Sequence, residues 1–215
     1  MSEANNPIFD AVRQILEGTQ LEIPDNTLPD PAMLSYYQFL SERKIFLEED
    51  VGFPIMEMIK LIMRWNQEDK DVPVESRKPI TIYIMSDGGY LSYMWAMLDA
   101  MLTSKTPIVT VNLGTAASAA ALIYLAGSRR YMMPTATVII HEGHTEMSGD
   151  ANKVMDATRN YNKELAKMKA FILSRTHIPP RVLNKKAKDD WYIDATECLE
   201  YGVCHKVVES LDEIM

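Results

Sequence analysis

Apolar and polar residues follow two alternating periodicities through the middle of this chain. Runs of β-branched and other apolar residues at 79–85, 108–113 and 137–141 predict buried strands. The segments at 90–104 and about 116–126, which lie between them, predict helices. Strands and helices that alternate in this way are typical of βαβ units. We therefore predict an α/β fold with a mainly parallel sheet.

Shorter patterns extend this core on both sides. A strand at 44–47 and a helix at 51–67 are predicted before it, followed by a charged, proline-containing loop at 68–78. We expect further short strands at 131–133 and 206–208. A short helix is predicted to begin at the capping-box-like sequence Asp194-Ala-Thr-Glu197 and to end at Gly202.

One predicted helix is unusually long. No glycine or proline occurs from Asp150 to Thr176, and side chains suited to one helix face recur every three or four residues: Val154, Thr158, Tyr161, Leu165, Met168 and Ile172. The pattern predicts a helix of about 25 residues, longer than most globular helices. Its apolar stripe either packs on the core of its own domain or makes contacts outside that domain, and the sequence leaves both alternatives open.

The first 31 residues differ in character from the rest. Asn6-Pro7 begins a short amphipathic pattern, and three prolines follow between positions 21 and 31. We interpret 1–31 as an arm and linker and 32–215 as one domain. The first residues lack the basic and apolar regions of a signal peptide, and the apolar stretch at 116–126 is too short to span a bilayer. We therefore expect a soluble, cytoplasmic protein.

The net charge and the cysteine content argue against several classes of binding protein and metal site. The formal net charge is -8, which argues against general binding to nucleic acid or to an anionic membrane. The two cysteines, Cys198 and Cys204, form neither a disulfide framework nor a usual zinc-binding spacing, so we expect reduced thiols.

Three side chains at the edges of predicted elements carry candidate chemistry. Ser118 lies where the alanine-rich helix begins, His141 ends a strand, and Asp190 follows a lysine-rich segment. A hydroxyl, an imidazole and a carboxylate are the groups of a serine hydrolase. Each also has a plainer interpretation, namely a serine within a packed helix, an edge or metal-binding histidine paired with His144, and a solvated charge.

Residue spacing alone does not select the carboxylate. Asp189, Asp194 and Glu142 are alternatives to Asp190. The glycine pair that follows the strand at 79–85, Gly88-Gly89, permits close approach of a ligand or forms a plain tight turn. Neither common glycine-rich nucleotide motif is present.

Taken together and in order, these motifs resemble the ClpP family, the proteolytic subunits of the ATP-dependent Clp protease, within the ClpP/crotonase superfamily. The resemblance runs from about Tyr36 to Val208 and rests on the following segments: Ile82-Tyr-Ile-Met-Ser-Asp-Gly-Gly, Gly114-Thr-Ala-Ala-Ser-Ala, Leu125-Ala-Gly, Met133-Pro, Ile140-His, Asp190-Trp-Tyr-Ile-Asp-Ala-Thr-Glu and Glu200-Tyr-Gly-Val.

The resemblance implies a serine endopeptidase without metal or organic cofactor. It assigns Ser118 as nucleophile, His141 as base and Asp190 as the orienting carboxylate, with the backbone N–H groups of Gly89 and Ala119 as oxyanion donors. It also implies heptameric rings, stacked in pairs as a tetradecamer through the long helix. Their chamber receives unfolded polypeptide from a Clp-type AAA+ ATPase.

Several positions depart from the family pattern. Asp87 replaces a usual proline before the glycine pair, and Glu142-Gly143 replaces Gln-Pro after the histidine. A second usual glycine pair is absent from Thr145-Glu-Met, and the turn at Ser128-Arg-Arg is short. These departures motivate one alternative, a non-catalytic structural subunit. A crotonase-type acyl-CoA enzyme is another.

The resemblance also points to a groove in which a Clp-type ATPase docks. The candidate residues that line this groove are Tyr83, Tyr131 and Met133.

Overall fold

The computed structural model describes residues 31–143 and 145–215. The chain divides into two compact units, residues 1–44 and 45–215, and each is considered by itself. Helix α2 (Pro31–Ser41) lies in the first unit and was not predicted from the sequence. The predicted helix that follows Pro7 and the linker before Pro31 fall outside the described residues. The division of the chain after residue 31 stays a prediction.

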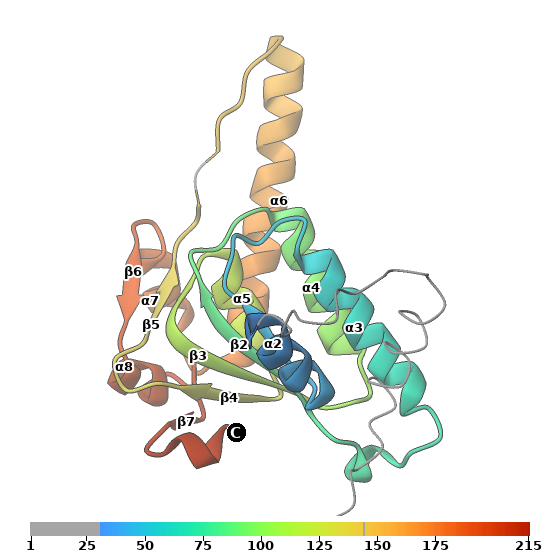
Figure 1. The fold of residues 1–215 in the computed structure, drawn as a ribbon. Coiled ribbons are helices and arrows are strands. Elements are labelled where there is room, and N and C mark those ends of the chain that lie inside the picture. Colours follow the sequence, from blue (N-terminus) through green and yellow to red (C-terminus); the bar gives the residue numbers. More distant parts are fainter. Residues whose placement is uncertain (1–30, 144) are drawn as a thin grey trace, which may run out of the picture. The chain divides into compact units, whose positions relative to one another are not determined.

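Within the described residues, seven strands form one sheet: β1 (Lys44–Leu47), β2 (Ile80–Ser86), β3 (Ile108–Ala117), β4 (Arg129–Met132), β5 (Thr137–Ile140), β6 (Trp191–Ile193) and β7 (Lys206–Val207). The main path is β1-β2-β3-β4-β7, while β5 pairs with β3 and with β6. The strand pairs β2–β3, β3–β4, β3–β5 and β4–β7 are parallel, and only β5–β6 is antiparallel among the pairs whose register is defined. The predicted α/β class with a mainly parallel sheet is confirmed (Figure 1).

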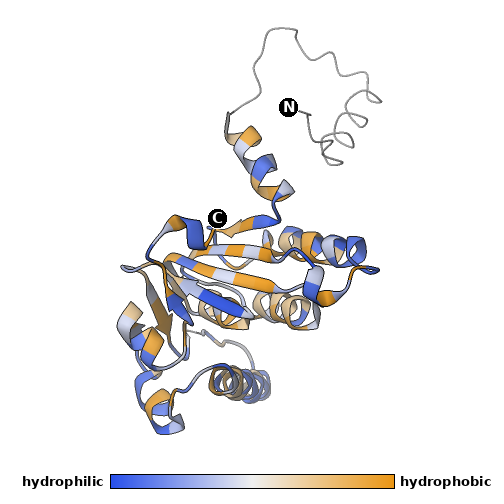
Figure 2. Cartoon of the chain, turned by 90° about the horizontal axis from the view of Figure 1, so that it is seen from below, coloured by the Kyte–Doolittle hydropathy of each residue, from blue (hydrophilic) through white to orange (hydrophobic). Residues whose placement is uncertain are grey.

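The helices of this unit are α3 (Ile55–Glu68), α4 (Leu91–Thr103), α5 (Ala119–Ala126), α6 (Ala151–Arg175), α7 (Pro180–Lys186) and α8 (Ala195–Glu200), with 3-10 turns at Val74–Ser76 and Leu211–Glu213. Helix α5 packs on β3 and lies against both α4 and α6. All eight of its residues are buried, because its alanine-rich sequence permits close approach from every side. Apolar residues also dominate most strands of the sheet (Figure 2).

Strand β3 divides its pairing between two neighbours. Its first part, Val109–Asn112, pairs with β4, and its last part, Thr115–Ala117, pairs with β5. The register against β2 shifts at the same place, since Ile84 pairs with Asn112 but Ser86 pairs with Ala116. Four steps along β3 therefore match two along β2, so the strand is irregular around Gly114.

The side chain of Asn112 fills this branch point. Asn112 is fully buried, and its Nδ2 donates to the carbonyl of Thr137 at 3.0 Å. Its Oδ1 accepts from the N–H of Gly114 at 3.1 Å. One amide thus bonds a backbone N–H of β3 and a backbone carbonyl of β5 at the place where the strand pairing divides. We name Asn112, Gly114 and Thr137 the β3 branch.

Helix α6 projects from the rest of its unit, and the chain between β5 and α6 runs beside it (Figure 1). The predicted long helix is confirmed almost to its ends. Of the predicted stripe, only Met168 and Ile172 are buried, and Thr158 is exposed. None of the described helices is long and apolar enough to cross a membrane.

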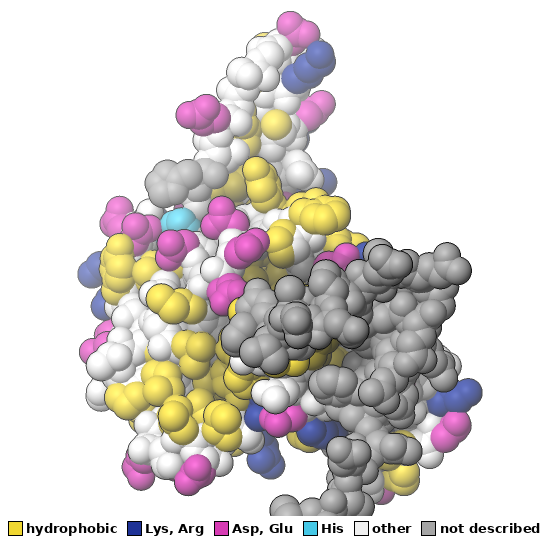
Figure 3. All heavy atoms as spheres, in the orientation of Figure 1, with side chains coloured by type: hydrophobic (Ala, Val, Ile, Leu, Met, Phe, Trp, Pro, Cys, Tyr) yellow, Lys and Arg dark blue, Asp and Glu magenta, His cyan; other side chains and the backbone are white. Residues whose placement is uncertain are grey.

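One apolar cluster combines the sheet with the last residues of the chain. Tyr83, Val111, Val208 and Ile214 are buried together, and Tyr131 and Met133 pack against them. The Tyr83 ring stacks on Phe46 with centroids 4.9 Å apart, and its hydroxyl donates to the carbonyl of Ile214. Hydrophobic side chains also gather on the surface over β4 and β7 (Figure 3).

Two arginines join the C-terminal ends of three helices. Arg130 donates to the carbonyls of Gly127, Arg175, Gly202 and Val203, which follow or end α5, α6 and α8. Arg175 donates to the carbonyls of Leu125, Ala126 and Gly127. Helix C-termini carry partial negative charge and unpaired carbonyls, which the guanidinium groups satisfy. Burial and the neighbouring Arg175 lower the pKa of Arg130.

Several predicted boundaries need correction. The prediction that Gly114 ends a strand and that a helix begins near Ala116 is wrong, because β3 continues to Ala117 and α5 begins at Ala119. Helix α3 begins at Ile55 rather than at Val51, since Val51 forms a bridge with Gly89. Strand β6 and helix α7 were not predicted.

Gly127 does end α5 as predicted, but for a different reason. Its φ of -56° is not left-handed. A Cβ atom there would lie 2.3 Å from Thr110 Oγ1, so close packing requires the glycine.

Replacing Asn112 with alanine is expected to loosen the β3 branch selectively. The variant removes the hydrogen bonds to the part-buried Gly114 N–H and Thr137 C=O, which costs about 2 kcal/mol in the free energy of unfolding. Chemical denaturation and hydrogen exchange measure this, and exchange should rise at Gly114 and along β5.

Asn66→Ala is the matched control, because Asn66 makes three hydrogen bonds between α3 and the segment after α4. It should destabilise the protein without raising exchange in β5. Equal protection of β5 in both variants would contradict the assigned role of Asn112.

Candidate active site

Ser118 occupies the sharp turn between β3 and α5. It is the N-cap residue of α5 with φ 53° and ψ -121°, and its N–H donates to the carbonyl of Ile139 at 2.9 Å. A positive φ in a residue other than glycine is strained, and such strain collects at functional sites. The turn takes the chain from a strand into a buried helix while Ser118 itself stays half-buried.

His141 and Asp190 face each other because β5 and β6 are antiparallel. Ile140 pairs with Trp191, so the next residue after β5 and the residue before β6 are opposite one another. The imidazole Nδ1 lies 3.0 Å from Asp190 Oδ1, within ion-pair distance. The imidazole is the more enclosed partner, with 19% of the His141 side chain exposed against 48% for Asp190.

The parallel pairing of β3 with β5 brings Ser118 to the same edge. Ala117 pairs with Ile139, so Ser118 and His141 follow directly at the carboxyl ends of neighbouring strands. Ligand sites of open α/β sheets form at this edge. The structure thus gathers Ser118, His141 and Asp190 at one place, from segments that are far apart in sequence.

The contacts also separate the carboxylates that spacing left open. Asp194 Oδ1 accepts from the N–H of Glu197 at 2.9 Å and caps α8, as its predicted role requires. Glu142 Oε1 accepts from Lys169 Nζ at 2.7 Å. Asp190 is the one found against His141.

The glycine pair packs tightly against the Ser118 turn. Gly88 has φ 103°, and a Cβ atom there would lie 2.7 Å from the Ala117 carbonyl oxygen and 2.8 Å from Ser118 Cβ. Gly89 has φ 149°, and its added Cβ would lie 2.5 Å from the Val51 carbonyl oxygen. Both positions require glycine for conformation and for space.

The two candidate oxyanion donors lie beside this contact. Ala119 is the first residue of α5, and the first N–H groups of a helix have no partner within it. An added Cβ on Gly88 would lie 3.0 Å from the Ala119 nitrogen, which places the glycine loop against that N–H. Gly89 is the next residue in this loop and is exposed.

Asp87, the departure from the family pattern next to this loop, is exposed. It lines a small hollow of about 180 Å³ together with Glu48, Glu49 and Asp50. Solvent screens an exposed carboxylate, so its effect on a charge at the glycine pair is weaker than that of a buried one.

Sequence reasoning missed the connection between His141 and helix α6. Glu142 N–H donates to the carbonyl of Ala187 at 2.8 Å, and its carbonyl accepts from Tyr161 Oη at 2.6 Å. Its carboxylate pairs with Lys169. Residues 142 and 169 are 27 positions apart, and no local pattern signals this contact.

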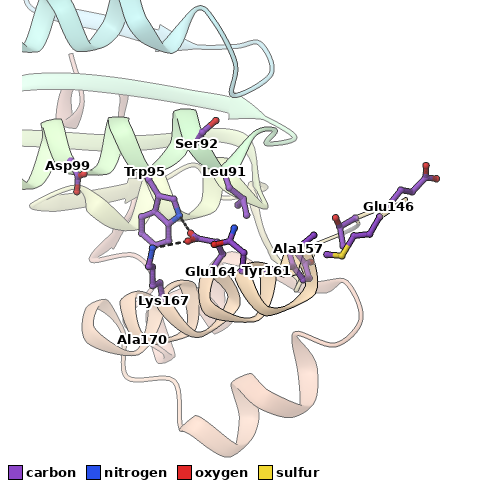
Figure 4. A pocket seen from close by; sticks show the side chains of 13 residues that line it. Leu91, Ser92, Trp95, Asp99, Glu146, Ala157, Tyr161, Glu164, Lys167 and Ala170 are labelled. Carbon is purple, nitrogen blue, oxygen red and sulfur yellow. Dashed lines mark hydrogen bonds and ion pairs between the residues drawn. The ribbon is translucent and has the colours of Figure 1, made fainter. Parts of the chain in front are cut away.

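A hollow of about 930 Å³ adjoins this region between α4 and α6. Trp95 Nε1 donates to Glu164 Oε2 at 2.6 Å, and Lys167 Nζ donates to Glu164 Oε1 at 2.8 Å (Figure 4). The Lys167 hydrogen bond lowers the pKa of Glu164. These polar contacts tie α4 to α6.

The structure tests the alternative of a metal site only for the residues that it describes. Among residues 31–143 and 145–215, no group of three or more His, Cys, Asp or Glu side chains is arranged to hold a metal ion. His144, the second histidine of the considered pair, lies outside these residues. Cys198 and Cys204 are buried free thiols, and burial raises the pKa of Cys204 to about 11 and that of Cys198 further.

Comparison with known proteins places this chain in a family. The family model described as Clp protease matches residues 30–211. The chain belongs to the Clp protease family. The family resemblance found in the sequence is thereby confirmed.

Individual relatives match most of the chain at low identity. The ATP-dependent Clp protease proteolytic subunit 2 of Treponema denticola is 28% identical over 198 residues, which cover 91% of this chain and 96% of the relative. Subunit 2 of Treponema pallidum is 30% identical over 81% of this chain and 86% of the relative. Subunit 1 of Shouchella clausii is 29% identical over 80% and 88%.

Gly88→Ala is expected to distort the Ser118 turn. The new methyl group would overlap the Ala117 carbonyl and Ser118 Cβ, and L residues rarely adopt φ 103°. We expect a lower melting temperature and at least tenfold slower reaction of Ser118 with a fluorophosphonate.

Gly114→Ala is the matched control on β3, because its added Cβ would meet only the Met85 side chain, at 3.8 Å. It should react at nearly the wild-type rate. Wild-type reactivity in Gly88→Ala would show that the glycine loop does not support the turn.

Proposed function

We propose that this chain is a serine-type endopeptidase of the Clp protease type, in which Ser118, His141 and Asp190 act as the catalytic triad. The observation that carries the proposal is the 3.0 Å contact between His141 Nδ1 and Asp190 Oδ1 at the strand edge where Ser118 begins α5. Membership of the Clp protease family supports peptide-bond hydrolysis as the reaction.

The three side chains have distinct roles in this proposal. His141 removes the proton of Ser118 through Nε2, because Nδ1 faces Asp190. Ser118 Oγ then attacks the carbonyl carbon of the peptide bond, and the imidazolium returns the proton to the leaving amine. Asp190 holds the imidazole and stabilises its positive charge. Water then attacks the acyl-enzyme by the reverse proton path and releases the acid product.

Backbone groups supply the second part of catalysis. The N–H groups of Gly89 and Ala119 are proposed to bind the oxyanion of the tetrahedral intermediate. The close contact between Gly88 and the Ala117–Ala119 turn supports this, because it holds the glycine loop beside the helix start. One such donor contributes about 10²–10³ in rate. No metal or organic cofactor takes part in this mechanism.

The family implies an oligomeric protease that works with Clp ATPases. We propose a heptameric ring, or two rings stacked as a tetradecamer through α6, that degrades unfolded polypeptide in the cytoplasm. The exposed Tyr192 and the half-buried Tyr131 and Met133 leave apolar surface in this unit. Tyr131 and Met133 are the proposed lining of a docking surface for the ATPase, whereas Tyr83 is buried in the core and does not line that surface, contrary to expectation.

Ser118→Ala is expected to abolish both peptide hydrolysis and fluorophosphonate labelling, because no other hydroxyl occupies the strained turn. Asp190→Asn should keep the fold but lower kcat by about 10⁴, since the amide favours the wrong imidazole tautomer. Peptide assays and mass spectrometry of the labelled protein measure both effects.

Asp189→Asn is the matched control and should retain nearly full activity. A folded wild-type protein that is neither labelled at Ser118 nor active would favour the structural-subunit alternative. Turnover of a CoA thioester that survives Ser118→Ala would favour the crotonase alternative.

A further inference from the structure

Glu142 bonds to two parts of its unit, helix α6 and the residue that follows α7, through three different groups. Its N–H donates to Ala187 O, its carbonyl accepts from Tyr161 Oη, and its carboxylate pairs with Lys169. The residue lies directly after His141, where β5 has ended. These bonds therefore fix the chain at the point where it leaves the sheet.

The partners of Glu142 connect both sides of the proposed triad. Ala187 follows α7 and is three residues before Asp190, so the bond from Glu142 N–H joins the His141 segment to the Asp190 segment. Tyr161 and Lys169 both belong to α6 and are about 12 Å apart along its axis. Burial, and then the nearby Glu142 charge, raise the pKa of Tyr161.

An exposed ion pair by itself would not support a positioning role for Glu142, because exposed pairs add little to the stability of a protein. The Glu142–Lys169 pair differs from most ion pairs of this unit, since only 30% and 28% of the two side chains are exposed. Other pairs on α6, such as Arg159–Asp156, leave 67% and 73% exposed. This ion pair and the bonds to Tyr161 and Ala187 all hold the same residue, Glu142.

We propose that Glu142 is a positioning residue which, held by Tyr161, Lys169 and Ala187, sets the distance between His141 and Asp190 and couples that distance to helix α6. The inference rests on the proposed peptidase function. The mechanism is geometric, because the Glu142 bonds go to Ala187, Tyr161 and Lys169 and not to Ser118.

Two single substitutions test the two contacts with α6. Lys169→Met removes the ion pair, and Tyr161→Phe removes the bond to the Glu142 carbonyl. Each is expected to lower kcat by about tenfold or more with KM within about twofold, because small displacements of catalytic groups are costly. The double variant should lose less than the product of the single effects, since both bonds hold one residue.

Lys169→Arg is the conservative variant and should restore most of the activity. Lys167→Met is the matched control, because Lys167 pairs with Glu164 on the same helix and does not touch the His141 segment. It should leave kcat unchanged. Unchanged kcat in both Lys169→Met and Tyr161→Phe, with the fold intact, would overturn the proposal.

Hydrogen exchange separates this proposal from the proposed function. In Lys169→Met and Tyr161→Phe, amide exchange should rise at residues 141–142 and 191–193 but stay unchanged in β2 and α4. This readout does not depend on activity. Loosening of these segments in a protein whose wild type is not a peptidase would support the positioning role while refuting the function, and unchanged exchange would refute the role itself.

Discussion

The division of β3 between two neighbouring strands is the constraint on which the rest of the site depends. The first part of β3 belongs to the main sheet, and the last part pairs with β5. Without this division, β5 would not lie beside the end of β3, and β6 would have no strand to pair with. Asn112 makes the division possible, because its amide satisfies the backbone groups that separate there.

From this branch, two pairing rules position the candidate catalytic groups. Parallel pairing aligns the carboxyl ends of β3 and β5, which places Ser118 near His141. Antiparallel pairing places Asp190 opposite His141. The geometry therefore follows from backbone hydrogen bonds, whereas side-chain contacts such as Glu142–Lys169 adjust it. A site built on strand ends is held more precisely than one built on loops alone.

Sequence patterns predicted the parts of the fold that have strong local signals. The strands β2 and β5 and the helices α4 and α6 were identified to within a few residues, because each combines a clear periodicity with recognisable ends. Strand β6 has only three residues and no periodic signal of its own, so it is defined only by pairing with β5. The start of α5 was misplaced because alanine suits both a closely packed strand end and a helix.

Local sequence patterns predicted even less of the candidate site than of the fold. Ser118 and His141 were found as chemical groups at element ends, but the choice of Asp190 over Asp189, Asp194 and Glu142 came only with the family resemblance. The reason is that β5–β6 pairing brings Asp190 to His141 across 49 positions of sequence (190 minus 141). The role of Glu142 is equally remote, since its partners lie on α6 and next to α7.

The two arginines at the helix ends have a consequence for how this unit opens. Arg130 and Arg175 share the Gly127 carbonyl, and Arg130 also bonds the Arg175 carbonyl, so α5, α6 and α8 end in one network. Each of these ends is bonded to Arg130, so fraying of any one of them removes bonds from the side chain that also holds the other two. We therefore expect the three helix ends to open together, and a lysine, with a single ammonium in place of the planar fork, would be a poor substitute at position 130.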